Sequence, residues 1–359
     1  MLFCSGIDDV LSGSVNVAGI QVQMSFWART FVKHGWNVYS LSEKQEAVIN
    51  DIHFIHKQKT WAERNGLSIV QEFVDSNKYL RVTKPDIVLI RASQRELYAM
   101  ARACEHHKTK LVFLGASDRD FEFGKEFVQG NAINKKLYRR GLQRVEHIVT
   151  QNQYQHDCLS KHYNKPSIII PNIWCFSEAS VTKEKEYAAV WVANLRRLKR
   201  AEWFVHLAKQ LPQHKFAIAG GISDREYYDA MKAEAEKLDN LNFLGPLPLT
   251  GVDDLLSKSK LLVCTSEFEG FPNTFLQAWA QSVPVVSTVN PNGCITEFDL
   301  GRVIDNESDL LKATEELLSS DELLEQCRQS IRAYFLSHHN ADIAFGRLME
   351  STKNEDENS

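Results

Sequence analysis

The sequence lacks the features of membrane-spanning proteins and of proteins stabilised by disulfide bonds or structural zinc. Across its 359 residues, no apolar run reaches the roughly 18 residues that a membrane-spanning helix needs. The N-terminal residues show neither the basic segment nor the long apolar segment of a signal peptide. The seven cysteines are odd in number, far apart and without a Cys-x-x-Cys pair, which disfavours a disulfide framework and a structural zinc site. We therefore expect a cytoplasmic protein, or one that lies on the inner face of the cell membrane without crossing it.

The sequence also lacks two common phosphate-binding loops. No Gly-x-Gly-x-x-Gly follows the first apolar segment, and no Gly-x-x-x-x-Gly-Lys-Ser/Thr occurs anywhere. These absences disfavour dinucleotide-dependent dehydrogenases and P-loop kinases.

What the sequence does contain is the pattern of two α/β domains. A chain of this length exceeds what one hydrophobic core usually spans. Short apolar runs alternate with stretches of helical period, which is typical of a parallel sheet covered by helices, and the pattern occurs twice. Two doubly wound domains in tandem favour a ligand in the cleft between them, at the carboxyl ends of the strands. The expected parts are an N-terminal, acceptor-side domain over 1–172, a polar linker over 173–186, a second domain over 187–336, a C-terminal helix over 337–353 that can pack back on the first domain, and a frayed tail over 354–359.

The same pattern predicts the individual elements. The strands expected in the first half cover residues 2–4, 37–41, 86–90, 110–114, 147–151 and 167–170, with helices over 21–34 and 95–107. The strands expected in the second half cover residues 187–192, 215–219, 241–244, 260–265 and 284–287, with helices over 201–210, 225–238, 273–281, 309–318 and 321–335.

The charge of the chain is unevenly distributed. Residues 1–175 carry 23 Lys and Arg against 17 Asp and Glu, whereas residues 176–359 carry 19 against 29. The positive excess is concentrated over residues 134–165. Most such runs are a solvated helix face. The alternative is a face that meets an anionic membrane surface, since clustered cations contribute about 1 kcal/mol each near anionic lipid. Nucleic-acid binding is disfavoured because the stretch has few aromatic residues and no recognised motif.

The most informative stretch follows an apolar strand that ends near Ser266. A glycine-containing turn comes next, and Pro272-Asn273-Thr274 supply the chemistry of a helix start. The free N–H groups and positive dipole end of that helix suit a phosphate, and Glu269 lies on the preceding turn. Periodicity alone also leaves open a strand-turn-helix unit with no ligand.

This stretch resembles the signature of the family-4 glycosyltransferases (glycosyl transferases group 1), whose pattern is S-x-x-E-G-F-x-x-x-x-x-E-A followed by P-V-V. Further matches occur in the family's order at residues 18–23, 34–38, 84–88, 150–155, 170–172 and 192–199. By this ordered set, the chain is identified as a member of a superfamily of retaining enzymes. The resemblance implies the GT-B fold, in which two Rossmann-like doubly wound domains face each other across a cleft.

The resemblance also implies roles for individual residues. Lys199 and Glu269 are the implied catalytic residues: Lys199 neutralises the diphosphate as it leaves, and Glu269 holds hydroxyls of the donor sugar. Gly19 lets the N-terminal loop approach the pyrophosphate, the backbone of 271–274 caps the distal phosphate, and residues 245–247 border the nucleobase. The implied donor-binding residues are Gly19, Asn194, Arg196, Arg197, Gly245, Pro246, Leu247, Gly270, Phe271, Pro272, Asn273, Thr274 and Gln277. In enzymes of this type the leaving phosphate accepts the acceptor's proton, so neither a dedicated base, a cofactor nor a metal is expected.

Three positions depart from the family pattern. Gln277 stands where the second glutamate is expected, a change that we place at about 1–2 kcal/mol of donor affinity, so Gln277→Glu should leave activity intact or raise it. Asn194 replaces the arginine of the phosphate segment. Arg196 or Arg197 can restore that charge, although alternation along an extended segment points only one of them to the side of Asn194. Ala18 replaces one of two glycines, which is the mildest change.

Asp118-Arg119-Asp120 spells a D-x-D beyond a predicted strand. In a different glycosyltransferase fold this pattern binds a divalent metal. The second doubly wound half argues against that fold, so we place Asp118 and Asp120 on the acceptor side and expect no metal site.

The expected function is therefore transfer of a sugar from a UDP- or GDP-linked donor to a hydroxyl of a glycan or lipid-linked glycan, as in the assembly of bacterial surface polysaccharides. The departures leave two alternatives open. One is a non-catalytic partner subunit of another glycosyltransferase, and the other is a nucleotide-sugar epimerase.

Overall fold

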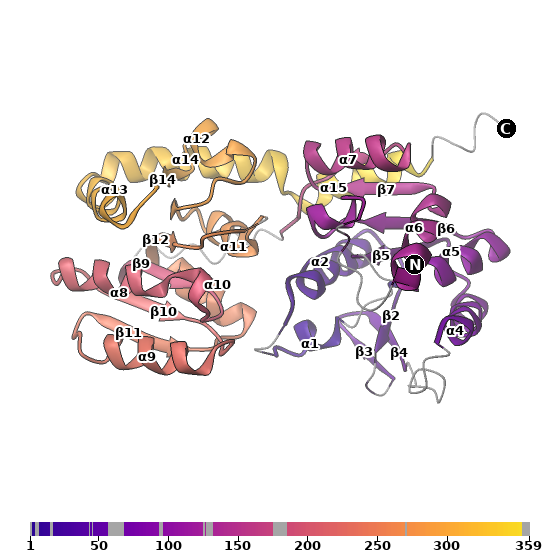
Figure 1. The fold of residues 1–359 in the computed structure, drawn as a ribbon, viewed down its shortest axis with the longest axis horizontal. Helices are drawn as coiled ribbons and strands as arrows, with labels where there is room; N and C mark the ends of the chain where they lie inside the picture. The colour runs from indigo at the N-terminus through magenta and orange to yellow at the C-terminus, as the bar shows by residue number, and fades with distance from the viewer. Residues whose placement is uncertain are drawn as a thin grey trace. The chain divides into compact units, whose positions relative to one another are not determined.

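The computed structural model divides the chain into two compact units (Figure 1). The first is built mainly from residues 17–173 and takes in the C-terminal segment from residue 341, and the second is built mainly from residues 174–340. The residues described are 2–3, 7–14, 17–42, 44, 46–56, 68–92, 96–124, 126, 132–174, 185–269 and 271–353.

The first unit contains an eight-stranded sheet in the order β3-β4-β2-β1-β5-β6-β7-β8. All neighbouring strands are parallel except β3, which is antiparallel to β4. Its strands are β1 Leu2–Phe3, β2 Val38–Ser42, β3 Ala47–Ile49, β4 Ile52–His56, β5 Ile87–Arg91, β6 Lys110–Leu114, β7 His147–Thr150 and β8 Ile168–Ile169. Its helices are α1 Asp8–Leu11, α2 Gly19–Lys33, α4 Ser68–Thr83, α5 Glu96–His107, η1 Asp118–Asp120, α6 Ala132–Arg144 and α7 Gln153–Tyr163.

The hairpin of β3 and β4 is an element that the sequence analysis missed. Its turn residues Asn50 and Asp51 both adopt positive φ, 51° and 61°. Two positive φ values in a two-residue loop match the twist of antiparallel strands, and Asn and Asp tolerate that conformation. The sequence could have predicted this hairpin from the Asn-Asp pair and the alternating Ile-His-Phe-Ile-His run that follows it.

The second unit contains a six-stranded, all-parallel sheet in the order β11-β10-β9-β12-β13-β14. Its strands are β9 Tyr187–Val192, β10 Phe216–Ala219, β11 Leu241–Gly245, β12 Ser259–Cys264, β13 Val285–Ser287 and β14 Gly301–Val303. Its helices are η3 Arg197–Lys199, α8 Ala201–Gln210, α9 Arg225–Ala235, α10 Leu249–Ser257, α11 Asn273–Ala280, η4 Pro291–Gly293, α12 Cys294–Glu297, α13 Glu307–Ser319 and α14 Asp321–His338. The central strands are buried along almost their whole length, because helices cover both faces of a parallel sheet. The strands predicted from apolar runs are present in both units, and β14 is an additional one.

The last helix, α15 (Ala341–Ser351), belongs to the first unit and packs against α2. The rings of Phe31 and Phe345 meet edge to face with centroids 4.9 Å apart, and Lys33 Nζ lies 2.6 Å from Asp342 Oδ2. Because α14 continues to His338, the boundary expected at residue 336 falls inside that helix.

The expected linker begins with buried residues rather than solvated ones. Ile173 exchanges two hydrogen bonds of 3.0 Å with the side-chain amide of Gln23, and Trp174 is 3% exposed. Residues 175–184 of the linker and the tail over 354–359 lie outside the described residues. Among the helices described, none is long and apolar enough to cross a membrane.

Candidate functional site

The candidate site lies in the second unit, at the carboxyl ends of β9 and β12. These strands are neighbours in the sheet although β10 and β11 lie between them in sequence. The chain winds outward from β9 to β10 in one direction and continues from β12 to β13 in the other. Doubly wound sheets bind their ligands outside the carboxyl ends of the strands at such a switch point.

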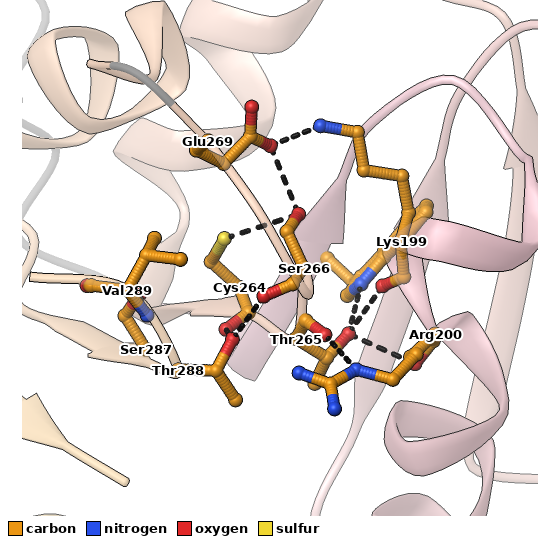
Figure 2. Close-up of polar contacts among 10 residues, drawn as sticks. Lys199, Arg200, Cys264, Thr265, Ser266, Glu269, Ser287, Thr288 and Val289 are labelled. Atoms are coloured by element: carbon orange, nitrogen blue, oxygen red, sulfur yellow. Dashed lines mark hydrogen bonds and ion pairs between the residues drawn. The ribbon is translucent and has the colours of Figure 1, made fainter. Parts of the chain in front are cut away.

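The segments that follow these two strands bring Lys199 and Glu269 together. Lys199 Nζ donates a hydrogen bond to Glu269 Oε1, and Ser266 Oγ donates to the same oxygen over 2.9 Å (Figure 2). Lys199 is 7% exposed, and the side chain of Glu269 is 21% exposed. A buried ammonium ion is tolerated only beside a counter-charge, so the two residues stabilise each other here. The two predicted catalytic residues are therefore in direct contact.

Thr265 fixes the backbone that carries Lys199. Its hydroxyl lies 2.7 Å from Lys199 O and 2.8 Å from Arg200 O, and it accepts a hydrogen bond of 3.0 Å from Trp191 Nε1. Arg200 Nε in turn donates to Thr265 O over 2.6 Å (Figure 2). Arg200 adopts a left-handed conformation, with φ 49°, between η3 and α8, so these bonds hold a tight reversal of the chain.

Two further hydrogen bonds secure the loop that carries Glu269. The N–H of Glu267 donates to Leu198 O over 2.9 Å, which ties the loop directly to η3. Thr288 Oγ1, just beyond β13, donates to Ser266 O over 2.6 Å (Figure 2). The positions of the ammonium and the carboxylate are thus set by backbone contacts and not only by their own ion pair.

The segment between β9 and η3 holds Asn194, Arg196 and Arg197. Asn194 Oδ1 accepts a hydrogen bond of 3.2 Å from the N–H of Gly221, so its side chain caps the neighbouring loop. Arg197 turns toward α9, with its guanidinium 3.8 Å from Asp224 Oδ2. Arg196 is exposed and forms no ion pair with a residue that the structure describes. Which of the two arginines restores the charge missing at Asn194 stays a prediction.

The turn after Glu269 leads into α11. Pro272 occupies the N-cap position and no side-chain cap is formed there, and Asn273 and Thr274 are the first residues of the helix. Phe271 packs edge to face on Trp279 with centroids 6.0 Å apart, which anchors the turn to the helix. Gly270 lies outside the described residues.

Gln277, on α11, makes a contact that the sequence did not indicate. Its side chain is buried, and its Nε2 donates to Asp253 Oδ1 on α10 over 3.2 Å. A carboxylate only accepts hydrogen bonds, so this contact orients the amide with Oε1 directed away from Asp253. The amide at this position is therefore matched to a carboxylate 24 residues earlier.

Residues 245–247 lie at the carboxyl end of β11, an edge strand of the same sheet. Gly245 ends that strand with φ 69°, a conformation that favours glycine, and its carbonyl accepts a bond of 2.9 Å from Gly220 N. Pro246 is exposed, Leu247 is half-buried, and both precede α10.

The remaining predicted residues lie in the first unit. Gly19 opens α2 and is exposed. Asp118 is half-buried and accepts a hydrogen bond of 2.9 Å from Gln155 Nε2. Asp120 is 1% exposed, and its Oδ2 accepts from the N–H groups of Ala116 and Ser117 over 2.7 and 3.0 Å. The carboxylate thus holds its own turn, and the acceptor-side role of Asp118 and Asp120 stays a prediction.

Asp120 also compensates a buried charge. Arg91, at the carboxyl end of β5, is 5% exposed and donates to Asn172 Oδ1 over 2.6 Å. Burial lowers the pKa of Arg91 to about 10, while the negative charge of Asp120 opposes that shift. Among the described residues, no group of three or more His, Cys, Asp or Glu side chains could hold a metal ion.

Comparison with known proteins finds a family model that matches the second unit. Residues 173–334 match the family model for glycosyl transferases group 1. The second unit thus carries a group 1 glycosyltransferase domain. "Glycosyltransferase 1 domain-containing protein 1" of Xenopus tropicalis is 23% identical over 160 residues, which make up 43% of this chain and 46% of that protein. The chain therefore matches less than half of the length of this curated relative.

Solved structures agree on the fold. A glycosyltransferase from Rickettsia africae has a TM-score of 0.72 and 14% identity, with 100% of this chain and 98% of that chain covered. TarM of S. aureus, solved in complex with UDP, has a TM-score of 0.61 and 16% identity, with 78% of this chain and 59% of that chain covered. The predicted GT-B fold, with two Rossmann-like units, is confirmed.

Sequence reasoning missed several residues of the site. Thr265, Ser266 and Thr288 carried a usable signal, since small hydroxyl residues at the carboxyl end of buried strands often bond neighbouring loops. Asp253 carried none, because its contact joins two helices and no local pattern marks it.

Proposed function

We propose that the chain is a retaining glycosyltransferase of family 4, which transfers a sugar from a UDP- or GDP-linked donor to a hydroxyl of a glycan or lipid-linked glycan. The observation that carries the proposal is the Lys199–Glu269 pair at the switch point of the unit that matches the family model. An acceptor of the kind extended in bacterial surface-polysaccharide assembly fits this class of reaction.

The roles follow from the contacts. The Lys199 ammonium has three N–H donors and uses one on Glu269, so two remain for oxygens of a donor diphosphate. Glu269 Oε1 is occupied by Lys199 and Ser266, whereas Oε2 forms no hydrogen bond with a described residue and can accept from a sugar hydroxyl. The N–H groups at the start of α11 supply further donors for phosphate.

In the proposed reaction, the bond between the anomeric carbon and the diphosphate breaks and a bond from that carbon to the acceptor oxygen forms. The acceptor's proton passes to an oxygen of the leaving phosphate, which Lys199 stabilises as negative charge develops there. Gln277 Oε1 is the acceptor that α11 offers to the ribose hydroxyls, since its Nε2 is held by Asp253. No metal takes part in this scheme, and activity unchanged by excess EDTA is the expected result.

The decisive experiment combines donor binding with turnover. Calorimetry and donor hydrolysis across the common UDP and GDP sugars should identify a donor, and NMR of the product should show retention at the anomeric carbon. Glu269→Ala and Lys199→Ala should each lower turnover at least a hundredfold. The absence of both binding and hydrolysis would favour the partner subunit, and a change of sugar without an acceptor would favour the epimerase.

Matched controls are available within the same segments. Glu267 is exposed and lies in the same loop as Glu269, and Lys209 is exposed on α8. Glu267→Ala and Lys209→Ala should retain near wild-type turnover. If all four variants behaved alike, the assignment of Lys199 and Glu269 would be wrong.

A further inference from the structure

The first unit contains a basic cavity that the proposed transfer reaction does not use. It measures about 590 Å³ and is lined by Tyr98 of α5 and by Lys136, Arg139, Arg140, Gln143 and Arg144 of α6. The α6 residues follow the spacing i, i+3, i+4, i+7, i+8, which places them on one face of the helix. We call these six residues the α6 cavity.

Close packing of two helices builds this cavity. Helices α5 and α6 lie side by side (Figure 1). A Cβ at Gly141 would come within 2.7 Å of the backbone nitrogen of Tyr98, so only glycine allows this approach. The contact brings the cationic face of α6 next to the ring of Tyr98, and the Arg144 guanidinium lies 5.8 Å from that ring's centroid.

The acidic residues nearby neutralise only part of the charge. Arg139 forms a forked pair with the buried Glu126, at 2.5 and 3.0 Å, and Arg144 lies 2.7 Å from Glu105. Lys136 and Arg140 form no ion pair with any residue that the structure describes. The cavity therefore retains two uncompensated positive charges.

The sequence places these cations at a spacing that disfavours the helix. Lys136, Arg140 and Arg144 are successive i, i+4 neighbours, and like charges at that spacing destabilise a helix by about 0.2–0.5 kcal/mol per pair. Guanidinium groups bind phosphate oxygens through two parallel N–H bonds, and a lysine adds a point charge. A bound phosphate would convert this repulsion into attraction.

We propose that the α6 cavity binds a phosphate-bearing anion through Lys136 and Arg140, with Arg144 and Tyr98 at its border. The volume exceeds that of a single phosphate ion, so a diphosphate or a phosphate that carries an organic group fits the space. Such a group belongs either to a soluble phosphate or to the head of a membrane lipid. No residue of the cavity belongs to the Lys199–Glu269 site, so the inference does not depend on transferase activity.

The test compares two double variants of the full chain. Lys136→Gln with Arg140→Gln removes the two uncompensated cations of the cavity. Lys78→Gln with Arg81→Gln removes one exposed lysine and one exposed arginine from α4 of the same unit. Both variants keep the Lys199–Glu269 site, so any binding there contributes equally to each. Because the cavity variant also loses like-charge neighbours, its melting temperature should be no lower than that of the wild type. Measuring that temperature checks that the variant is folded.

Two experiments measure binding by each variant: calorimetry with inorganic pyrophosphate, and flotation on lipid vesicles. The vesicles contain phosphatidylcholine alone or with 20% phosphatidylglycerol. The cavity variant should bind pyrophosphate or the anionic vesicles at least tenfold more weakly than the α4 variant does. Loss on the vesicles identifies a lipid head group as the source, and loss on pyrophosphate alone identifies a soluble ligand. Equal binding by the two variants with every probe, or no binding by the wild type, would overturn the proposal.

Discussion

The contact between Gln277 and Asp253 gives the most direct physical prediction. Gln277→Glu preserves the shape of the side chain but places a carboxylate oxygen about 3.2 Å from Asp253 Oδ1, where an N–H donor now lies. Two unit charges about 4 Å apart repel by about 4 kcal/mol at an effective dielectric constant of 20. Holding one of two carboxylates protonated at pH 7 costs about as much, since the ordinary pKa values are near 4. We therefore expect the variant to lose about 3 kcal/mol of unfolding free energy at pH 7.5.

The pH dependence and a second substitution identify the cause. A proton shared by the two carboxylates binds the folded variant more tightly than the unfolded one, so the loss should shrink as the pH falls toward 5. Asp253→Asn combined with Gln277→Glu restores one carboxylate and one amide with reversed polarity. This double variant should recover most of the loss, which gives a coupling energy of about 3 kcal/mol.

Urea denaturation of the wild type, Asp253→Asn, Gln277→Glu and the double variant at pH 7.5 and 5.5 measures these free energies. For a unit of this size, 3 kcal/mol corresponds to about 6–12 °C in melting temperature. The sequence alone predicted that Gln277→Glu leaves activity intact or raises it. Because of the contact with Asp253, we now expect this result of the double variant instead. If the single variant were as stable as the wild type, and the double variant no more stable than the single one, the electrostatic argument would be refuted.

Three further predictions concern stability. Thr265→Val removes the hydroxyl that lies 2.7 Å from Lys199 O, so we expect a loss of about 1–3 kcal/mol in urea denaturation together with lower turnover; unchanged turnover would show that the bond does not position Lys199. Asp120→Asn weakens the buried acceptor of two backbone N–H groups and removes a negative charge that favours the charged form of Arg91, so it should cost about 1–3 kcal/mol in urea denaturation, whereas a neutral effect would show that the carboxylate does not stabilise this turn. Burial lowers the pKa of Lys185 to about 8, so between pH 8 and 10.5 the unfolded chain holds more protons than the folded one and this lysine becomes less destabilising as the pH rises. The stability of the wild type relative to Lys185→Met should therefore increase between pH 7 and 10, and a flat difference would contradict the burial of Lys185.

Much of the fold could be predicted because apolar runs and helical periods are local properties. The strands of the second unit, from β9 to β13, were located this way, since buried parallel strands appear as continuous apolar runs. The β3–β4 hairpin and β14 were not located; β3 and β14 have only three residues each, which carry little periodicity. The order of strands in each sheet was also beyond local reasoning. That β9 lies beside β12 follows from packing the whole unit.

The site followed the same division between local and long-range information. The sequence placed Lys199 and Glu269 after separate strands, and only the strand order brings them together. The burial of Asp120 could not be predicted, because the D-x-D pattern does not show whether a carboxylate faces solvent or its own backbone. From the sequence, Gln277 was interpreted as the loss of a glutamate. The structure shows that its amide donates a hydrogen bond to Asp253, which a glutamate could not do.

The ion pair at the centre of the site links stability to the proposed chemistry. An ammonium as buried as that of Lys199 would be costly without a counter-charge, and Glu269 supplies one. Because that pair uses one of three N–H donors on Lys199, a diphosphate can bind the other two without breaking it. Removing Glu269 therefore has two effects: it leaves the buried Lys199 ammonium unpaired, and it removes a contact with the donor sugar. Part of the turnover lost in Glu269→Ala comes from displacement of Lys199. Glu269→Gln, which retains an acceptor oxygen for the ammonium, separates the two effects: it should remain closer to wild-type stability than Glu269→Ala while still losing turnover.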